Sequence, residues 1–208
     1  MDVVKPFGRS RTIQGMGNDE TGDAGLWEKS LQGDGAAFGL LFDRHRDRVF
    51  RHAYRLAGKQ QDAEDVMSTA FLELWRCRRK VRLVEGSVLP WLLVTTTNVA
   101  RNSSRAAHRY RRLLDSLPRG EGVVNPADHV FLQGELDLDA ARALSTLNNL
   151  DLQLVSLVVF EGYTIAAAAA TLELTPEAAK SRMHRARLRM KTAFNGMAQA
   201  APALGGEQ

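Results

Sequence analysis

Apolar residues recur every three or four positions through most of this chain, which predicts an all-α fold. One apolar stripe follows Asp34, a good N-cap, and ends at Gly58, a good C-terminal stop. Its members are Phe38, Leu41, Phe42, His45, Val49, Ala53 and Leu56. A second stripe begins near Asp62 and contains Ala63, Val66, Met67, Ala70, Phe71 and Leu74. No strand is expected, because the Val and Thr clusters at 94–97 and 154–160 lie inside helix-length periodic segments.

A third long helix is predicted from about Trp91 to Leu114. Its start is apolar and its end is basic, so one end can be buried while the other lies along DNA. The basic end contains Arg101, Arg105, Arg109, Arg111 and Arg112. Four more helical segments are predicted, at roughly 135–147, 149–160, 164–172 and 176–194.

Glycine, proline and polar residues divide the sequence into two small helical domains joined by a flexible linker. Residues 1–25 are rich in Gly, Asp, Asn and Thr and are interpreted as a disordered tail. Residues 115–134 hold several Gly and Pro residues and are interpreted as the linker. The predicted domains are therefore 26–114 and 135–194, followed by a disordered tail at 195–208.

The net charge of the chain is only +4, but its charged residues are unevenly distributed along the sequence. Between residues 76 and 112 Glu85 is the only acidic residue among ten Lys and Arg, whereas between 135 and 161 Arg142 is the only base among five acids. Alternating basic and acidic blocks suggest that some faces meet nucleic acid and others meet a protein partner.

Several function classes are excluded by what the sequence lacks. Cys77 is the only cysteine, so neither an intramolecular disulfide nor a cysteine-based zinc site is possible, and a reducing, cytoplasmic setting fits. No secretory signal and no apolar stretch of about 20 residues is present, so membrane insertion is not expected. The motifs of nucleotide-binding, metalloprotease and hydrolase sites are also absent, so we expect no enzyme, no cofactor and no metal site.

The segment 175–187 reads as a capped, basic helix that follows a short helix after a tight turn. Thr175 can cap it, Pro176 suits its first turn and Glu177 suits the positive end of its dipole. The bases then follow without one acidic residue: Lys180, Arg182, Arg185, Arg187, Arg189 and Lys191. This is the layout of the recognition helix of a helix-turn-helix, the alternative being a solvated basic surface helix.

With these blocks in order, the chain resembles the sigma-70 family of bacterial transcription initiation factors, specifically the small two-domain extracytoplasmic-function (ECF) group. The matching segments are 62–76, 91–102 and 161–187, and the resemblance covers about residues 26–192. One departure is Glu173, which stands in the helix-turn-helix where the family usually has Gly.

The resemblance implies an alternative sigma factor that binds core RNA polymerase, directs it to promoter DNA and helps open the −10 element. The residues that it implies for polymerase binding are Asp62, Asp65, Phe71 and Trp75. Those for the −10 element are Asn98, Arg101 and Arg105. Those for the −35 element are Lys180, Ser181, Arg182 and Arg185, which helical spacing places opposite an inward face of Ala179, Met183 and Ala186. An anti-sigma factor is a further candidate partner.

Other interpretations of these residues stay open at the level of sequence. Phe71 and Trp75 could be core residues, and Asn98, Arg101 and Arg105 could contact phosphates without reading bases. A stand-alone helix-turn-helix transcriptional regulator is the main alternative function, and a helical adaptor that binds only proteins is another.

Overall fold

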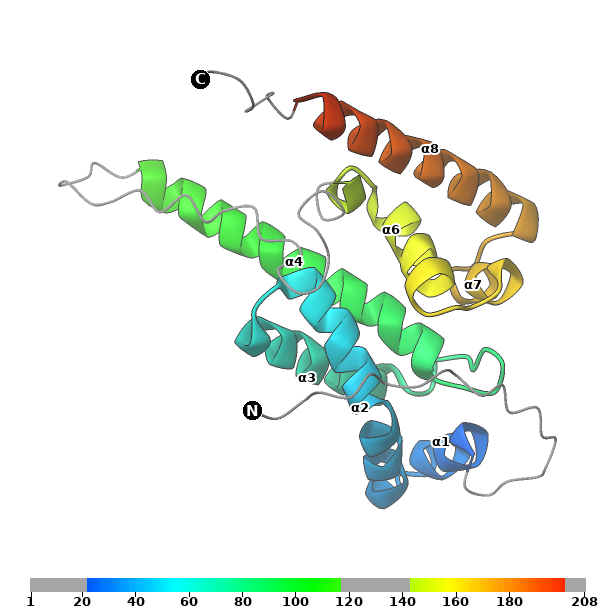
Figure 1. The fold of residues 1–208 in the computed structure, drawn as a ribbon. Helices are drawn as coiled ribbons and strands as arrows, with labels where there is room; N and C mark the ends of the chain where they lie inside the picture. The colour runs from blue at the N-terminus through cyan, green and yellow to red at the C-terminus, as the bar shows by residue number, and fades with distance from the viewer. Residues whose placement is uncertain (1–21, 117–142, 201–208) are drawn as a thin grey trace, which may run out of the picture.

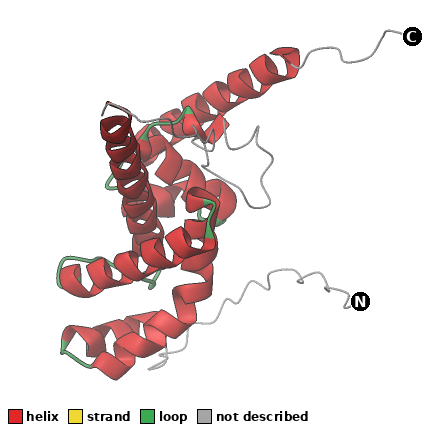
Figure 2. Cartoon of the chain, turned by 90° about the vertical axis from the view of Figure 1, so that its left-hand side faces the viewer, coloured by secondary structure: helices red, strands yellow, loops and turns green. Residues whose placement is uncertain are grey.

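The computed structural model describes residues 22–116 and 143–200, and every regular element within these ranges is a helix (Figure 2). The first domain consists of α1 (Asp23–Leu31), α2 (Gly35–Ala57), α3 (Gln60–Cys77) and α4 (Leu89–Ser116). The second consists of α6 (Asn149–Val155), the π-helix η1 (Ser156–Phe160), α7 (Ile165–Thr171) and α8 (Pro176–Ala200). The prediction of an all-α fold with two small domains is confirmed.

The predicted helix ends agree with the structure where a cap marks them. The Asp34 carboxylate accepts hydrogen bonds from the N–H groups of Ala36 and Ala37, and Gly58 ends α2 with a φ of 74°. The Thr175 hydroxyl accepts a hydrogen bond from the N–H of Ala178 at the start of α8. These are side-chain and backbone signals that act within one turn, which is why the sequence shows them.

Elsewhere the boundaries differ. Helix α1 begins at Asp23, inside the segment predicted as a tail, and α8 continues to Ala200, beyond the predicted end at 194. The predicted linker and most of the predicted helix at 135–147 lie outside the described residues.

A buried carboxylate, that of Asp23, holds helix α1 against the rest of the first domain. The glycines around Asp23 led the sequence analysis to assign this segment to the tail. The Asp23 side chain, 7% exposed, lies 2.8 Å from an Arg44 nitrogen and 2.7 Å from Nε2 of His45. It also accepts a hydrogen bond of 2.5 Å from the Ser87 hydroxyl. Burial raises the pKa of Asp23, but the hydrogen bonds from His45 and Ser87 and the charge of His45 outweigh it, so the pKa lies well below its usual range. Helix α1, helix α2 and the loop before α4 therefore meet at one charged group.

Helices α2, α3 and α4 pack on one another around the predicted apolar stripes (Figure 1). Leu41, Val49 and Ala53 of α2 are fully buried, as are Ala63 and Leu74 of α3. Helix α4 changes character along its length, as its sequence predicts. Its first half is packed in the domain, whereas its second half is largely exposed and extends beyond the other helices in Figure 1.

Small side chains line the contact between α7 and α8 in the second domain. Ala168 and Ala169 of α7 and Ala179 and Ala186 of α8 are buried, and their small size permits the helices to approach closely. Glu173, in the turn between α7 and α8, has a φ of 55°, a left-handed conformation that favours glycine. The turn forms despite the residue, so it stores some backbone strain.

Candidate nucleic-acid and protein interfaces

The recognition helix exposes three of its four predicted −35 residues. Lys180, Ser181 and Arg185 are exposed on α8, while Met183 and Ala186 are buried against the rest of the domain. This division follows the helical spacing, and it leaves a basic outer face that is free to contact DNA phosphates and base edges.

The fourth residue, Arg182, faces another way. Its Nη1 lies 3.0 Å from Oδ1 of Asp151 in α6, and Nη1 of Arg189 lies 3.0 Å from the other carboxylate oxygen. The Asp151 side chain is 4% exposed, and Nδ2 of Asn148 also donates to it, at 2.8 Å. Arg182 therefore joins α8 to α6 in this structure, and its role at the −35 element stays a prediction.

Sequence reasoning did not find Asp151, although the sequence holds a signal. A single acid within the apolar run 150–158 must be paired if the helix is buried, because an unpaired buried charge is costly. The signal indicates that a cationic partner exists, but periodicity alone cannot show which arginines supply it.

The predicted −10 residues lie on α4, and the structure separates them. Oδ1 of Asn98 accepts hydrogen bonds from Nδ2 of Asn149 at 2.7 Å and from Nε2 of Gln153 at 2.6 Å. Nη2 of Arg101 donates to the Leu147 carbonyl at 3.1 Å. Arg105, one turn further on, is exposed. Two of the three predicted residues are thus bound to the second domain.

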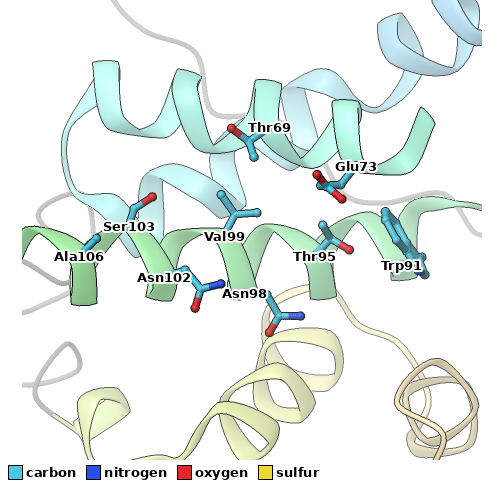
Figure 3. A pocket seen from close by; sticks show the side chains of 9 residues that line it. All are labelled: Thr69, Glu73, Trp91, Thr95, Asn98, Val99, Asn102, Ser103 and Ala106. Atoms are coloured by element: carbon cyan, nitrogen blue, oxygen red, sulfur yellow. The ribbon is translucent and has the colours of Figure 1, made fainter. Parts of the chain in front are cut away.

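A groove of about 630 Å³ runs between α3 and α4 beside these residues (Figure 3). Its lining is mostly apolar and also carries hydroxyl groups, two asparagine amides, the Glu73 carboxylate and one indole ring. An indole ring beside amide groups can stack on a nucleobase and hydrogen-bond to its edge. The lining residues are Thr69, Glu73, Trp91, Thr95, Asn98, Val99, Asn102, Ser103 and Ala106. Trp91 is half-buried and packs against the core, so it anchors the start of α4 in the first domain.

A second groove, of about 540 Å³, lies between α2 and α3 and is mostly apolar. Phe71 and Trp75, both predicted to bind polymerase, line it together with Phe38 and Phe42. Phe71 is 4% exposed and meets Phe42 edge-on at 4.7 Å, so it is mainly a core residue. Trp75 is half-buried against Phe38.

The predicted acidic residues of α3, Asp62 and Asp65, are exposed on the same helix. Leu72, at the edge of the apolar groove, is 63% exposed and was missed in the sequence, where its outward position is visible from the helical period. Exposed acids beside a partly open aromatic groove form a surface suited to a helical protein partner.

The two domains also meet at Glu161, which follows η1. Its side chain, 4% exposed, accepts hydrogen bonds from Arg48, at 2.6 Å, and from Arg55, both on α2. The sequence shows Glu161 only as the first residue of a motif, because its partners are 106 and 113 positions away.

Among the residues that the structure describes, no group of three His, Cys, Asp or Glu side chains could hold a metal ion. Within the same residues, no helix is long and apolar enough to cross a membrane.

Comparisons with known proteins agree with this division of the chain. A family model described as Sigma-70 region 2 matches residues 41–110, and one described as Sigma-70, region 4 matches residues 138–190. The RNA polymerase sigma factor CarQ of Myxococcus xanthus is 31% identical over 157 residues, which are 73% of this chain and 87% of CarQ. The ECF RNA polymerase sigma factor SigE of Mycolicibacterium smegmatis is 31% identical over 155 residues, which are 73% of this chain and 59% of SigE.

A solved structure shares the fold. The structure of CnrH in complex with the cytosolic domain of CnrY matches with a TM-score of 0.55 at 21% identity, covering 84% of this chain and 97% of CnrH. The RNA polymerase sigma factor CnrH of Cupriavidus metallidurans is 27% identical in sequence over 185 residues.

Proposed function

Since this chain belongs to the sigma-70 family of RNA polymerase sigma factors, in its ECF group, we propose that it is an alternative sigma factor that binds core RNA polymerase, directs it to specific promoters and helps open the −10 element. One observation carries the proposal: the chain contains Sigma-70 region 2 followed by region 4, and region 4 includes a capped helix, α8, whose outer face is basic. Catalysis of RNA synthesis would belong to the polymerase.

The second domain would bind the −35 element through the outer face of α8. Lys180 and Arg185 are exposed cations on a helix whose opposite side is buried, so the helix can enter a major groove without disturbing the core. Ser181 lies between them and can donate to a phosphate or to a base edge. Arg182 would contribute by fixing the orientation of α8 through Asp151.

The first domain would bind polymerase and the −10 element with different faces. The apolar groove beside Trp75 and the exposed Asp62 and Asp65 support a protein contact on α3. The groove between α3 and α4, with its indole ring and asparagine amides, and the basic end of α4 support contact with an unpaired DNA strand. An anti-sigma factor is a candidate second protein partner. The apolar groove and exposed acids of α3 suit a helix of the polymerase and a helix of an anti-sigma factor equally.

The test is transcription in vitro by core polymerase, with and without the protein, on a pool of promoter fragments from the native genome. Discrete new start sites that share upstream motifs are expected. If no new start appears while the free protein protects a DNA site, the chain is a stand-alone helix-turn-helix regulator and the proposal fails.

Variants assign the surfaces within the same assay. Asp65→Lys should reduce binding to core polymerase, whereas Glu28→Lys, an equal change of charge at an exposed position of α1, should not. Arg185→Ala should reduce the new starts while leaving polymerase binding intact. Wild-type polymerase binding by folded Asp65→Lys would overturn the assignment of α3.

A further inference from the structure

A tight turn stands immediately before α4, and hydrogen bonds fix its geometry. Val84 and Ser87 exchange both of their backbone hydrogen bonds, at 3.2 Å and 3.1 Å, around the tip residues Glu85 and Gly86. Glu85 has a φ of 53° and Gly86 a φ of 73°, the pair of left-handed residues that is typical of a type I′ turn. Both tip residues are exposed, so the turn presents the Glu85 side chain to solvent beside the start of α4.

The Ser87 hydroxyl joins this turn to two helices. It donates a hydrogen bond of 2.5 Å to Oδ2 of Asp23 in α1. It also accepts a hydrogen bond of 3.1 Å from the N–H of Leu89, the first residue of α4. The turn at 84–87, the start of α1 and the start of α4 are therefore connected through one oxygen atom.

Asp23 can hold the turn because its own carboxylate is held from the other side. Nη1 of Arg44 donates to Oδ1 at 2.8 Å, and Nε2 of His45 lies 2.7 Å from Oδ2. Burial alone would raise the pKa of Asp23, but the hydrogen bonds from His45 and Ser87 lower it below the usual range, so the carboxylate is ionised at neutral pH. A buried, ionised acceptor makes stronger hydrogen bonds than an exposed neutral one, so it fixes the donors around it.

The charges around the turn suit contact with a base as well as with phosphates. Glu85 is the only acid between residues 76 and 112, and Arg82, three positions before it, is exposed and can hold a phosphate. A carboxylate repels phosphates, but it accepts hydrogen bonds from an exocyclic amine such as that of cytosine. In an unpaired strand this amine is free to bind. At this position Glu85 therefore favours a base that carries an amine over thymine.

The turn also adjoins the groove between α3 and α4. Trp91, four positions after Ser87 in the first turn of α4, lines one end of this groove (Figure 3). A shift of the turn would therefore move the start of α4 and, with it, the indole ring. The geometry that Ser87 fixes is shared by the exposed tip of the turn and by the groove.

We propose that Asp23 is a positioning residue for promoter recognition: through the Ser87 hydroxyl it holds the turn at 84–87 in the geometry in which Glu85 selects one base of the unpaired −10 strand. Asp23 is 7% exposed and acts only through Ser87. The part that concerns DNA rests on the proposed function, whereas the link from Asp23 to the turn does not. Helix α1 lies before the residues 41–110 that match Sigma-70 region 2, so this gives recognition a component outside that region.

Base selection is measured by transcription in vitro with core polymerase on a promoter that depends on this protein and whose −10 element has been randomised. The wild-type protein should prefer a base with an amine over thymine at one position. Glu85→Ala should remove this preference and so identify the position. Ser87→Ala should lower the same preference about tenfold and leave the preferences at the −35 element unchanged. Ser87→Thr, which keeps a hydroxyl, should restore the preference.

Matched variants separate positioning from general stability. Asp23→Ala should lose the same preference as Ser87→Ala, and the double variant should lose no more than either single variant, because both changes break one link. Glu28→Ala, at an exposed position of α1, should keep the wild-type preference. An equal loss of transcription over all −10 sequences in Asp23→Ala and Ser87→Ala would show that Asp23 only stabilises the fold. That result, or a wild-type preference in Ser87→Ala, would overturn the proposal.

Hydrogen exchange in the free chain tests the link without DNA or polymerase. The amides of Val84 and Ser87 are hydrogen-bonded within the turn and should exchange several-fold faster in Asp23→Ala than in the wild type. Ser87→Ala, which leaves Asp23 paired with Arg44 and His45, gives the same readout at Val84 if Asp23→Ala does not fold. Wild-type exchange rates in these variants would overturn the link. If the wild-type protein yields no new start sites, the proposed function and the role in base selection both fail, and exchange still decides whether Asp23 holds the turn.

Discussion

Replacement of Arg182 should lower the stability of the second domain, whereas replacement of Arg185 should not. Asp151 is 4% exposed and has three side-chain donors: Arg182, Arg189 and Asn148. In Arg182→Gln the Oδ1 atom loses its charged donor while the carboxylate stays buried. A charge-assisted hydrogen bond to such a group contributes about 1.5–3 kcal/mol, and Arg189 still compensates the charge, so we expect a loss of about 2 kcal/mol.

Unfolding of the full chain in urea measures this loss. For a small domain whose free energy of unfolding falls by about 1 kcal/mol per molar of urea, the midpoint should fall by about 2 M. All three tryptophans, Trp27, Trp75 and Trp91, lie in the first domain. Tryptophan fluorescence therefore follows the first domain alone, while circular dichroism follows both, and the shift should be larger in circular dichroism.

Arg185→Gln is the matched control, because Arg185 is exposed one turn away, whereas the side chains that bind the Asp151 carboxylate are those of Arg182, Arg189 and Asn148. It should unfold at the wild-type midpoint and yet reduce transcription from promoters that depend on the −35 element. If Arg182→Gln unfolds like the wild type, the buried ion pair does not stabilise the domain, and the reasoning fails. If the two variants lose transcription equally with no change in stability, Arg182 contacts DNA directly.

Two further predictions concern buried chemistry and backbone strain. Burial and the charge of Arg55 lower the pKa of His52 to about 4 from 6.5, so its neutral form contributes stability that is complete above pH 6.5 and lost as pH falls through 4, by roughly 3 kcal/mol. Urea unfolding between pH 7 and pH 4 should show this loss in the wild type and less of it in His52→Gln, and equal losses would contradict the assignment. Glu173→Gly should raise the stability of the second domain by about 1 kcal/mol by relieving the left-handed backbone, while Glu173→Ala should not; an equal gain in both would show that the side chain, and not φ, is the cause.

Features that act within one or two turns of helix could be predicted from the sequence. The buried stripe of α2, the Asp34 and Thr175 caps and the stop at Gly58 follow from helical period and from side chains that hydrogen-bond to nearby backbone. The inward face of α8 follows from the same period, and its sequence also identified the exposed cations Lys180 and Arg185.

Features that join distant segments could not be predicted. Asp151 is 31 positions from Arg182, and Glu161 is more than 100 positions from both Arg48 and Arg55. The residues next to each acid in the sequence therefore do not indicate which arginines pair with it. Helical spacing alone groups Asn98 and Arg101 with Arg105, and only the packing of α6 and of the residues before it on α4 separates them. Whether these side chains bind DNA stays a prediction.

The π-helix at Ser156–Phe160 makes the position of Glu161 sensitive to the insertion or deletion of a single residue. A π-helix accommodates one residue more than the equivalent turn of α-helix, and here the Glu161 N–H reaches back five positions to the Ser156 carbonyl, at 3.1 Å. A relative that lacks one residue in this segment would continue α6 as a regular α-helix, and its acid would be rotated by about 100° around the helix axis. Insertion or deletion of one residue in this turn, without any substitution at Glu161, Arg48 or Arg55, would thus be enough to create or remove the ion pairs of Glu161 with α2.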